Sequence, residues 1–151
     1  MLLDSVADSE CECDDELELS WWELDRRAVQ KVTTRGLKVR ILLPRGVDFC
    51  HGLVLTSTSR ELRVAVKVAA CEVLSITPPD RLMGVLALEL GNLHVPTEIV
   101  DGEVRVIADG PVEQVIKDLG VQAERRVVRF QPRRCAGTPQ VRLSGSFRVV
   151  S

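Results

Sequence analysis

The chain has 151 residues, of which 45% are hydrophobic and 28% are charged, and its formal net charge is −2. This balance is typical of globular proteins and excludes a wholly disordered chain. The longest apolar stretches, such as residues 82–88, stop well short of the roughly 20 residues that a membrane span needs. The acidic N-terminus also lacks the pattern of a signal peptide, so we expect a cytoplasmic protein without membrane attachment.

Charge is distributed unevenly along the chain. Residues 1–25 contain ten Asp or Glu and no Lys or Arg, whereas residues 121–151 contain seven Arg and one Glu. Clustered cations are a requirement for binding nucleic acid, but no recognised nucleic-acid motif accompanies these arginines, so we expect no such partner. The five cysteines are an odd number in a chain without secretory features, which favours reduced thiols over a disulfide framework.

The first half of the sequence predicts a small β-rich domain. Residues 1–15 hold too little apolar surface to offset the entropy of ordering, so we expect a mobile acidic tail there. Residues 17–21, 37–41 and 62–68 then alternate between apolar and polar side chains with the period of a half-buried strand. Pro78 and Pro79 cannot continue a strand ladder, and we therefore place this domain at residues 16–76.

In the second half the apolar period becomes helical. A first helix is predicted over residues 82–90, with Gly91 or Asn92 as its left-handed C-terminal cap. Its apolar residues recur at helical spacing: Leu82, Val85, Leu86 and Leu90. A second helix is predicted between a cap at Asp109 and a stop at Gly120.

Four short strands accompany these two helices, at residues 73–76, 98–100, 104–107 and 127–130, with Asp101-Gly102 as a tight hairpin turn. The resulting order is strand, helix, strand, strand, helix, strand, which is that of the ferredoxin-like βαββαβ fold. We therefore expect an α+β protein of two domains, with the second domain at residues 77–136 and a C-terminal tail at residues 137–151.

Only two histidines, His51 and His94, are available for acid–base chemistry or metal binding. An isolated histidine is often a surface or core-edge residue with one hydrogen bond. Cys50-His51 has the residue types of a nucleophile and a base, but sequence neighbours seldom face each other, and no oxyanion hole or orienting acid is recognisable. A glycine-rich phosphate loop is also missing. The sequence therefore predicts neither an enzyme nor a GTPase.

The stretch Leu90-Gly91-Asn92-Leu93-His94-Val95-Pro96 resembles the signature of the urease accessory protein E family. The resemblance covers roughly residues 17–137 and includes Asp109, Leu119-Gly120 and Phe130-Gln131-Pro132. It implies a β-rich, peptide-binding-like N-terminal domain and a ferredoxin-like, metal-binding C-terminal domain through which the protein forms a homodimer. It also implies that the chain is a nickel metallochaperone, with His94 as the shared metal ligand at the dimer axis.

By the same resemblance, the expected partners are the GTPase-type urease accessory protein and the apo-urease complex. Neutral imidazole binds nickel, zinc and copper alike, so zinc and copper are expected competitors. The alternative is a protein-interaction or scaffold module of the urease maturation complex with weak or no nickel binding.

The chain differs from many family members in having fewer potential metal-binding side chains. Many members end in a histidine-rich tail, and some have a second histidine where Gly110 stands, but this chain has neither. Cys11 and Cys13 form a C-x-C pair in the acidic segment, and Cys135 lies near the C-terminal tail. These three thiols are additional candidate ligands, although the pair in the acidic segment is also compatible with two incidental cysteines.

Overall fold

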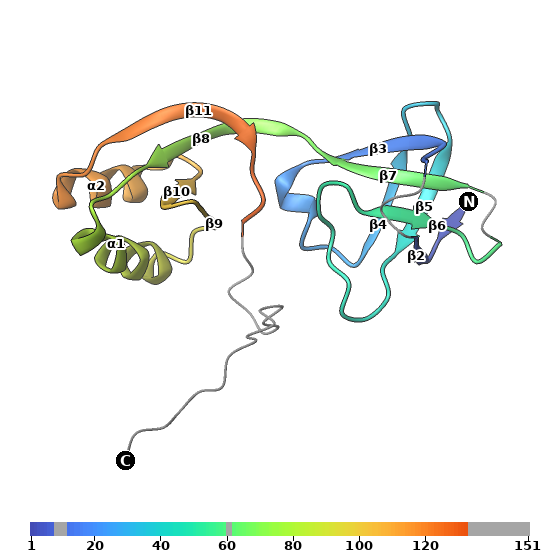
Figure 1. Cartoon of the computed structure of the whole chain (residues 1–151), viewed down its shortest axis with the longest axis horizontal. Helices are drawn as coiled ribbons and strands as arrows, with labels where there is room; N and C mark the ends of the chain where they lie inside the picture. The colour runs from blue at the N-terminus through green and yellow to red at the C-terminus, as the bar shows by residue number, and fades with distance from the viewer. Residues whose placement is uncertain (8–11, 60–61, 133–151) are drawn as a thin grey trace, which may run out of the picture.

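The computed structural model describes residues 1–7, 12–59 and 62–132, and every structural statement below concerns these ranges. The described residues contain two separate clusters of buried apolar side chains, one in each half of the chain. Figure 1 shows the two halves as lobes that are joined by a nearly continuous ribbon of strand.

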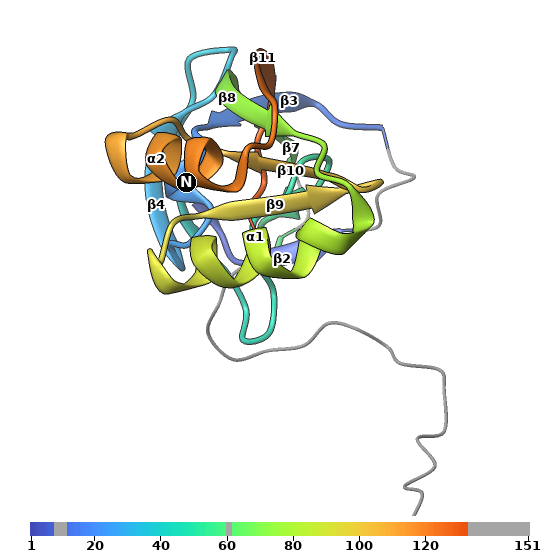
Figure 2. The same ribbon diagram turned by 90° about the vertical axis from the view of Figure 1, so that its left-hand side faces the viewer.

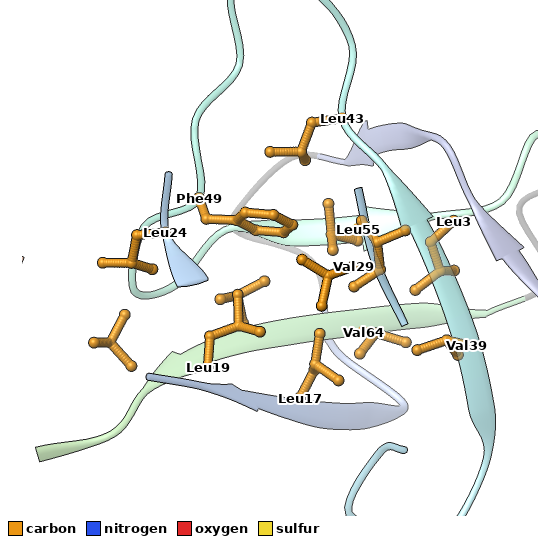
Figure 3. Close-up of a cluster of buried hydrophobic side chains, with 13 residues drawn as sticks. Leu3, Leu17, Leu19, Leu24, Val29, Val39, Leu43, Phe49, Leu55 and Val64 are labelled. Carbon is orange, nitrogen blue, oxygen red and sulfur yellow. The ribbon is translucent and has the colours of Figure 1, made fainter. Parts of the chain in front are cut away.

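Two small sheets enclose the core of the N-terminal lobe. The first contains, in spatial order, β1 (Leu2–Leu3), β5 (Lys38–Leu42) and β4 (Ala28–Val32). The second contains β2 (Ser5–Ala7), β6 (Val54–Thr56), β7 (Arg63–Val68) and β3 (Asp15–Leu19). Buried and exposed residues alternate along β3 and β5, as in strands with one face against a core. Their inward side chains, including Leu17, Leu19 and Val39, meet in the cluster of Figure 3.

The N-terminal residues belong to this core, so the predicted mobile tail over residues 1–15 is wrong for residues 1–7. Leu3 is fully buried, and β1 pairs in parallel with β5. Asp15 begins β3, and its Oδ1 accepts hydrogen bonds from the backbone N–H of Glu16 at 2.8 Å and of Arg35 at 3.2 Å. Residues 1–7 are ordered despite their low apolar content because Leu3 packs into a core whose other side chains come from strands far along the sequence.

The strand that was expected over residues 17–21 ends at Leu19, before the short 3₁₀ helix η1 (Trp21–Glu23). The Glu23 carboxylate accepts the backbone N–H of Ser20 at 3.0 Å and pairs with Lys31 Nζ at 2.8 Å. These polar interactions stabilise a turn after Leu19. The alternation of apolar residues does not predict them, and so it does not predict where the strand ends.

A four-stranded antiparallel sheet and two helices form the C-terminal lobe. The sheet order is β11 (Ala123–Arg129), β8 (Ala70–Ile76), β10 (Glu103–Val106) and β9 (Thr97–Val100). Helix α1 (Asp80–Asn92) follows β8, and α2 (Gly110–Leu119) follows β10, so the elements occur in the predicted order. Figures 1 and 2 show both helices on the same face of the sheet, where Leu86 and Ile116 join Leu74 in the core. Neither helix is long and apolar enough to cross a membrane.

The lobes divide at a different point from the one expected between residues 76 and 77. Strand β8 pairs with β10 and β11 of the C-terminal sheet, and only Ala69 separates it from β7. Pro78 and Pro79 instead precede α1, with Pro79 at its N-cap. A proline pair marks the end of a strand, but it does not indicate which sheet that strand joins.

Three local predictions in this lobe are confirmed: the cap at Asp109, the stop at Gly120 and the hairpin turn at Asp101-Gly102. The Asp109 Oδ1 caps α2 by accepting the backbone N–H of Val112 at 2.8 Å. Gly120 ends the same helix in the left-handed conformation, with φ of 64°. Asp101 and Gly102 have φ of 50° and 78°, the two positive values that a tight type I′ hairpin turn requires.

An aromatic contact joins the two lobes. Phe130, which directly follows β11, is fully buried. Its ring meets Trp21 of the N-terminal lobe edge-on, with the ring centroids 5.5 Å apart. Edge-to-face packing of this kind is favourable beyond the burial of apolar area, so it stabilises the junction.

His51 provides a polar contact at the same junction. Its backbone N–H donates to Gln131 Oε1 at 2.8 Å, its Nδ1 accepts the Val68 N–H at 3.2 Å, and its Nε2 lies 3.0 Å from Arg129 Nη1. Desolvation, together with the cations of Arg129 and Lys67, lowers the pKa of His51 below the usual 6.5. The contact therefore favours the neutral imidazole.

This contact predicts a loss of stability in acid. As the pH falls through about 6.5, His51 of the unfolded chain takes up a proton before His51 of the folded chain, so the free energy of unfolding decreases through that window. Urea unfolding at several pH values between about 5 and 8 should show wild type losing stability relative to His51→Gln as the pH is lowered. If the two stability curves run parallel, His51 does not contribute in this way.

Candidate metal centre

His94 lies at the point where α1 ends and the chain turns towards β9. Helix α1 runs through Asn92, with Leu93 as its C-cap. The backbone N–H of His94 then bonds to the Gly91 carbonyl at 3.0 Å, and that of Val95 bonds to the Leu90 carbonyl at 3.4 Å. These two bonds define a Schellman motif, in which His94 occupies the position that glycine usually takes.

The backbone of His94 is left-handed, with φ of 54°. The prediction that Gly91 or Asn92 would provide this cap is therefore wrong, because both residues are still helical. A residue with a Cβ pays roughly 1–2 kcal/mol for this conformation, a cost that glycine avoids. Val95 packs against the C-terminal core just beyond it and holds the motif closed. Strained backbone positions of this kind cluster at functional sites, and imidazole is a side chain that is able to bind metals.

His94 is exposed. Within residues 1–7, 12–59 and 62–132, no three His, Cys, Asp or Glu side chains gather into a group that could hold a metal. Cys13 is exposed, whereas Cys11 and Cys135 lie outside the described residues. Gly110 begins α2 and offers no side chain. In a single copy of the described chain, His94 therefore has too few protein ligands for a closed metal site.

Val85 and Leu88 form an exposed apolar stripe on α1, and Leu93, beside His94, is exposed as well. Val85 is 42% exposed, Leu88 is 62% exposed, and Leu93, next to the histidine, is 37% exposed. Val85 and Leu88 are three residues apart and thus lie on one side of the helix. The sequence pattern had grouped Val85 with the core residues Leu86 and Leu90, but the structure leaves it uncovered. The sequence does contain a sign of this exposed face, because α1 has more apolar residues than one face of a helix can bury.

Two glycines widen this stripe. Gly84 and Gly91 lie in α1, and a Cβ at either position would meet nothing within 4 Å. Glycine inside a helix is less favourable than alanine by about 1 kcal/mol, and packing within the chain does not require it here. Small residues on an exposed helix face permit the close approach of another backbone.

The structure argues against a nucleophile at Cys50. Desolvation and the nearby Asp48 carboxylate raise the pKa of the Cys50 thiol, so that little reactive thiolate is present at neutral pH. The neighbouring His51 is engaged with Val68 and Arg129 at the lobe junction. Burial beside Glu98 likewise raises the pKa of Cys71 in β8. Neither thiol is activated for catalysis.

Comparison with known proteins identifies the family. Residues 70–144, which contain His94 and all of β8 to β11, match the family model described as UreE urease accessory protein, C-terminal domain. The chain is 32% identical over 116 residues to the urease accessory protein UreE of Lysinibacillus sphaericus, an alignment that covers 76% of this chain and 78% of the relative. The chain belongs to the UreE family. UreE proteins are accessory proteins, and this chain is accordingly not an enzyme.

Other UreE proteins match a similar part of the chain. The UreE of Halalkalibacterium halodurans is 32% identical over 117 residues, which cover 76% of this chain and 77% of the relative. The UreE of Burkholderia lata is 37% identical over 98 residues, which cover 64% of this chain but only 47% of that longer relative. The similarity to UreE therefore extends beyond the C-terminal lobe.

The left-handed position of His94 can be tested by substitution. His94→Gly and His94→Ala both remove the imidazole, but only glycine relieves the backbone strain. We expect His94→Gly to be more stable than His94→Ala by about 1 kcal/mol in urea unfolding. Equal stability of the two variants would show that the backbone at residue 94 is not held left-handed in solution.

Proposed function

We propose that this UreE protein is a nickel carrier for urease maturation, which holds nickel between the His94 side chains of two copies in a homodimer. The observation that carries the proposal is an exposed imidazole, fixed by the cap of α1, at the end of an exposed apolar helix face. Nickel is the cargo of this protein and not a resident cofactor, so an open site with few ligands suits both uptake and release.

The apolar stripe on α1 supports a second copy of the chain as its partner. In a two-fold interface the same patch of both copies meets, and a residue close to the axis lies close to its own counterpart. Val85, Leu88 and Leu93 supply apolar contact area, and Gly84 allows close approach. The dimer thereby converts one histidine per chain into a pair of imidazoles.

Imidazole alone does not select nickel, because it also binds zinc and copper. The assignment of nickel rests on membership of the UreE family, whose relatives are named urease accessory proteins. Water or side chains from other segments complete the ligand shell, and Cys11, Cys13 and Cys135 remain candidates for that role. In this proposal the C-terminal lobe is a ferredoxin-like metal-binding domain, and the N-terminal lobe is a peptide-binding-like domain.

The proposed partners are the GTPase-type urease accessory protein and the apo-urease complex, in the cytoplasm. A second candidate function is a scaffold within the same complex that binds little or no nickel. It is favoured by the small ligand set of the described residues, which contain no group of three potential metal ligands. The scaffold would bind the GTPase-type protein equally well in the presence of nickel and of a chelator.

Nickel titration by calorimetry tests the central assignment. We expect the wild-type dimer to bind one ion per two chains, and His94→Ala to weaken that binding by more than about tenfold, because a directly coordinating nitrogen is lost. His51→Gln is the matched control, since His51 is the only other histidine in the chain and lies at the lobe junction. Equal nickel binding by wild type and His94→Ala would refute the site.

The dimer interface has its own test. Leu88→Glu places a charge in the centre of the apolar stripe, and we expect it to yield a monomer in sedimentation velocity and to weaken nickel binding together with dimerisation. Val127→Glu is the control, because Val127 is also exposed, at 71%, but lies on β11, away from α1. A Leu88→Glu protein that stays dimeric would place the interface elsewhere.

A further inference from the structure

The outer face of the sheet formed by β1, β5 and β4 has no described element packed on it. Val29 and Val39 point from this sheet into the N-terminal core (Figure 3). Because side chains alternate along a strand, the residues between them face outward. On β4 and β5 these outward residues are Ala28, Gln30, Val32, Lys38, Arg40 and Leu42, all of which are exposed.

Large apolar side chains occupy much of this outer face. Val32 is 55% exposed, Leu42 is 52% exposed, and Leu2 of the adjacent β1 is 46% exposed. The sheet registers place Leu2 beside Arg40 and Val32 beside Lys38, so two of these three apolar residues neighbour a cation. A hollow of about 370 Å³ opens here, lined in part by Gln30, Val32, Lys38 and Arg40.

The charge on this face is of one sign. Lys38 and Arg40 are its charged residues, and neither forms an ion pair with any residue in the described ranges. The exposed cations elsewhere in the chain include Arg125 and Lys67, which are paired with carboxylates. An apolar face with unneutralised cations favours a partner that brings both apolar and acidic side chains.

No strand of the described residues pairs with the outer edge of β4 either. The Leu43 N–H bonds to the Arg27 carbonyl, and the Thr33 N–H bonds to the Leu37 carbonyl. In an antiparallel pair every second residue bonds to the neighbouring strand, so Val29 and Lys31 also face β5. The backbone groups of the alternate residues, including Gln30, therefore point away from the sheet, and β4 is its last strand.

We propose that the edge of β4 binds an extended acidic segment of a partner protein, which adds a strand to the sheet and places carboxylates near Lys38 and Arg40. The added strand would lie two strand spacings, about 10 Å, from β5. A Lys or Arg side chain and a Glu side chain span that distance together. Strand addition gives affinity through the main chain, and the cations and apolar residues give specificity.

The chain's own acidic strand is not available as this occupant. Glu16 and Glu18 alternate with leucines in β3, but within one copy of the chain β3 belongs to the other sheet of this lobe, where it pairs with β7. The occupant is therefore a segment of another protein. The proposed site lies in the N-terminal lobe and is independent of His94, so failure of one assignment leaves the other intact.

Fluorescence anisotropy of the full chain with a labelled peptide of alternating Glu and Val tests the proposal. We expect this peptide to bind, a matched peptide of alternating Lys and Val not to bind, and the affinity to fall in high salt. The double variant Lys38→Glu and Arg40→Glu should weaken binding by about tenfold or more. A control with the same change in charge on the helices, Arg81→Glu and Lys117→Glu, should bind like wild type.

A second variant separates strand addition from simple charge attraction. Gln30→Pro removes a backbone N–H that points away from the sheet, so the chain's own ladder is kept while pairing with an added strand is blocked. We expect it to weaken peptide binding by about tenfold with an unchanged circular dichroism spectrum. Normal binding by Gln30→Pro, or by the Lys38 and Arg40 double variant, would overturn the proposal. The proposal would also be overturned if the wild-type protein associates with itself and Gln30→Pro abolishes that association, because the strand that binds β4 would then come from a second copy.

Discussion

The closure of α1 by a Schellman motif at a histidine is the constraint on which the candidate site depends. The two backbone bonds of His94 and Val95 force residue 94 into the left-handed region, where glycine would be the least costly residue. Because the backbone is held there by the packing of Val95 on the core, the imidazole leaves the helix end in one direction and stays exposed. A flexible loop would carry the same side chain without fixing its position.

The remainder of the C-terminal lobe holds α1, and with it His94, in place. The sheet and the buried face of α1 anchor the helix through residues such as Leu86 and Leu90, while the opposite face leaves Val85 and Leu88 uncovered. An exposed apolar face that ends at a single histidine makes sense if the site is completed by a second copy.

The N-terminal lobe combines an ordered start of the chain with an open sheet edge. Leu3 is buried in the core, and the strand that contains it pairs with β5, whereas one edge of β4 has no partner among the described strands. Phe130 against Trp21, together with the bonds of His51, connects this lobe to the metal-binding candidate. The two lobes thus offer distinct surfaces, one of which is apolar near the candidate ligand His94 and the other apolar and cationic.

Features that depend on neighbouring residues could be predicted from the sequence. The cap at Asp109, the stop at Gly120 and the Asp101-Gly102 turn follow from local backbone preferences, and the motif around His94 indicated the family. Features that depend on distant residues required the tertiary structure. The burial of Leu3 and the exposure of Val85 are decided by which strands and helices meet. The sequence therefore determined that His94 is the candidate ligand, whereas the fold decided its left-handed backbone and its place beside an uncovered apolar face, because both arise from packing across the chain.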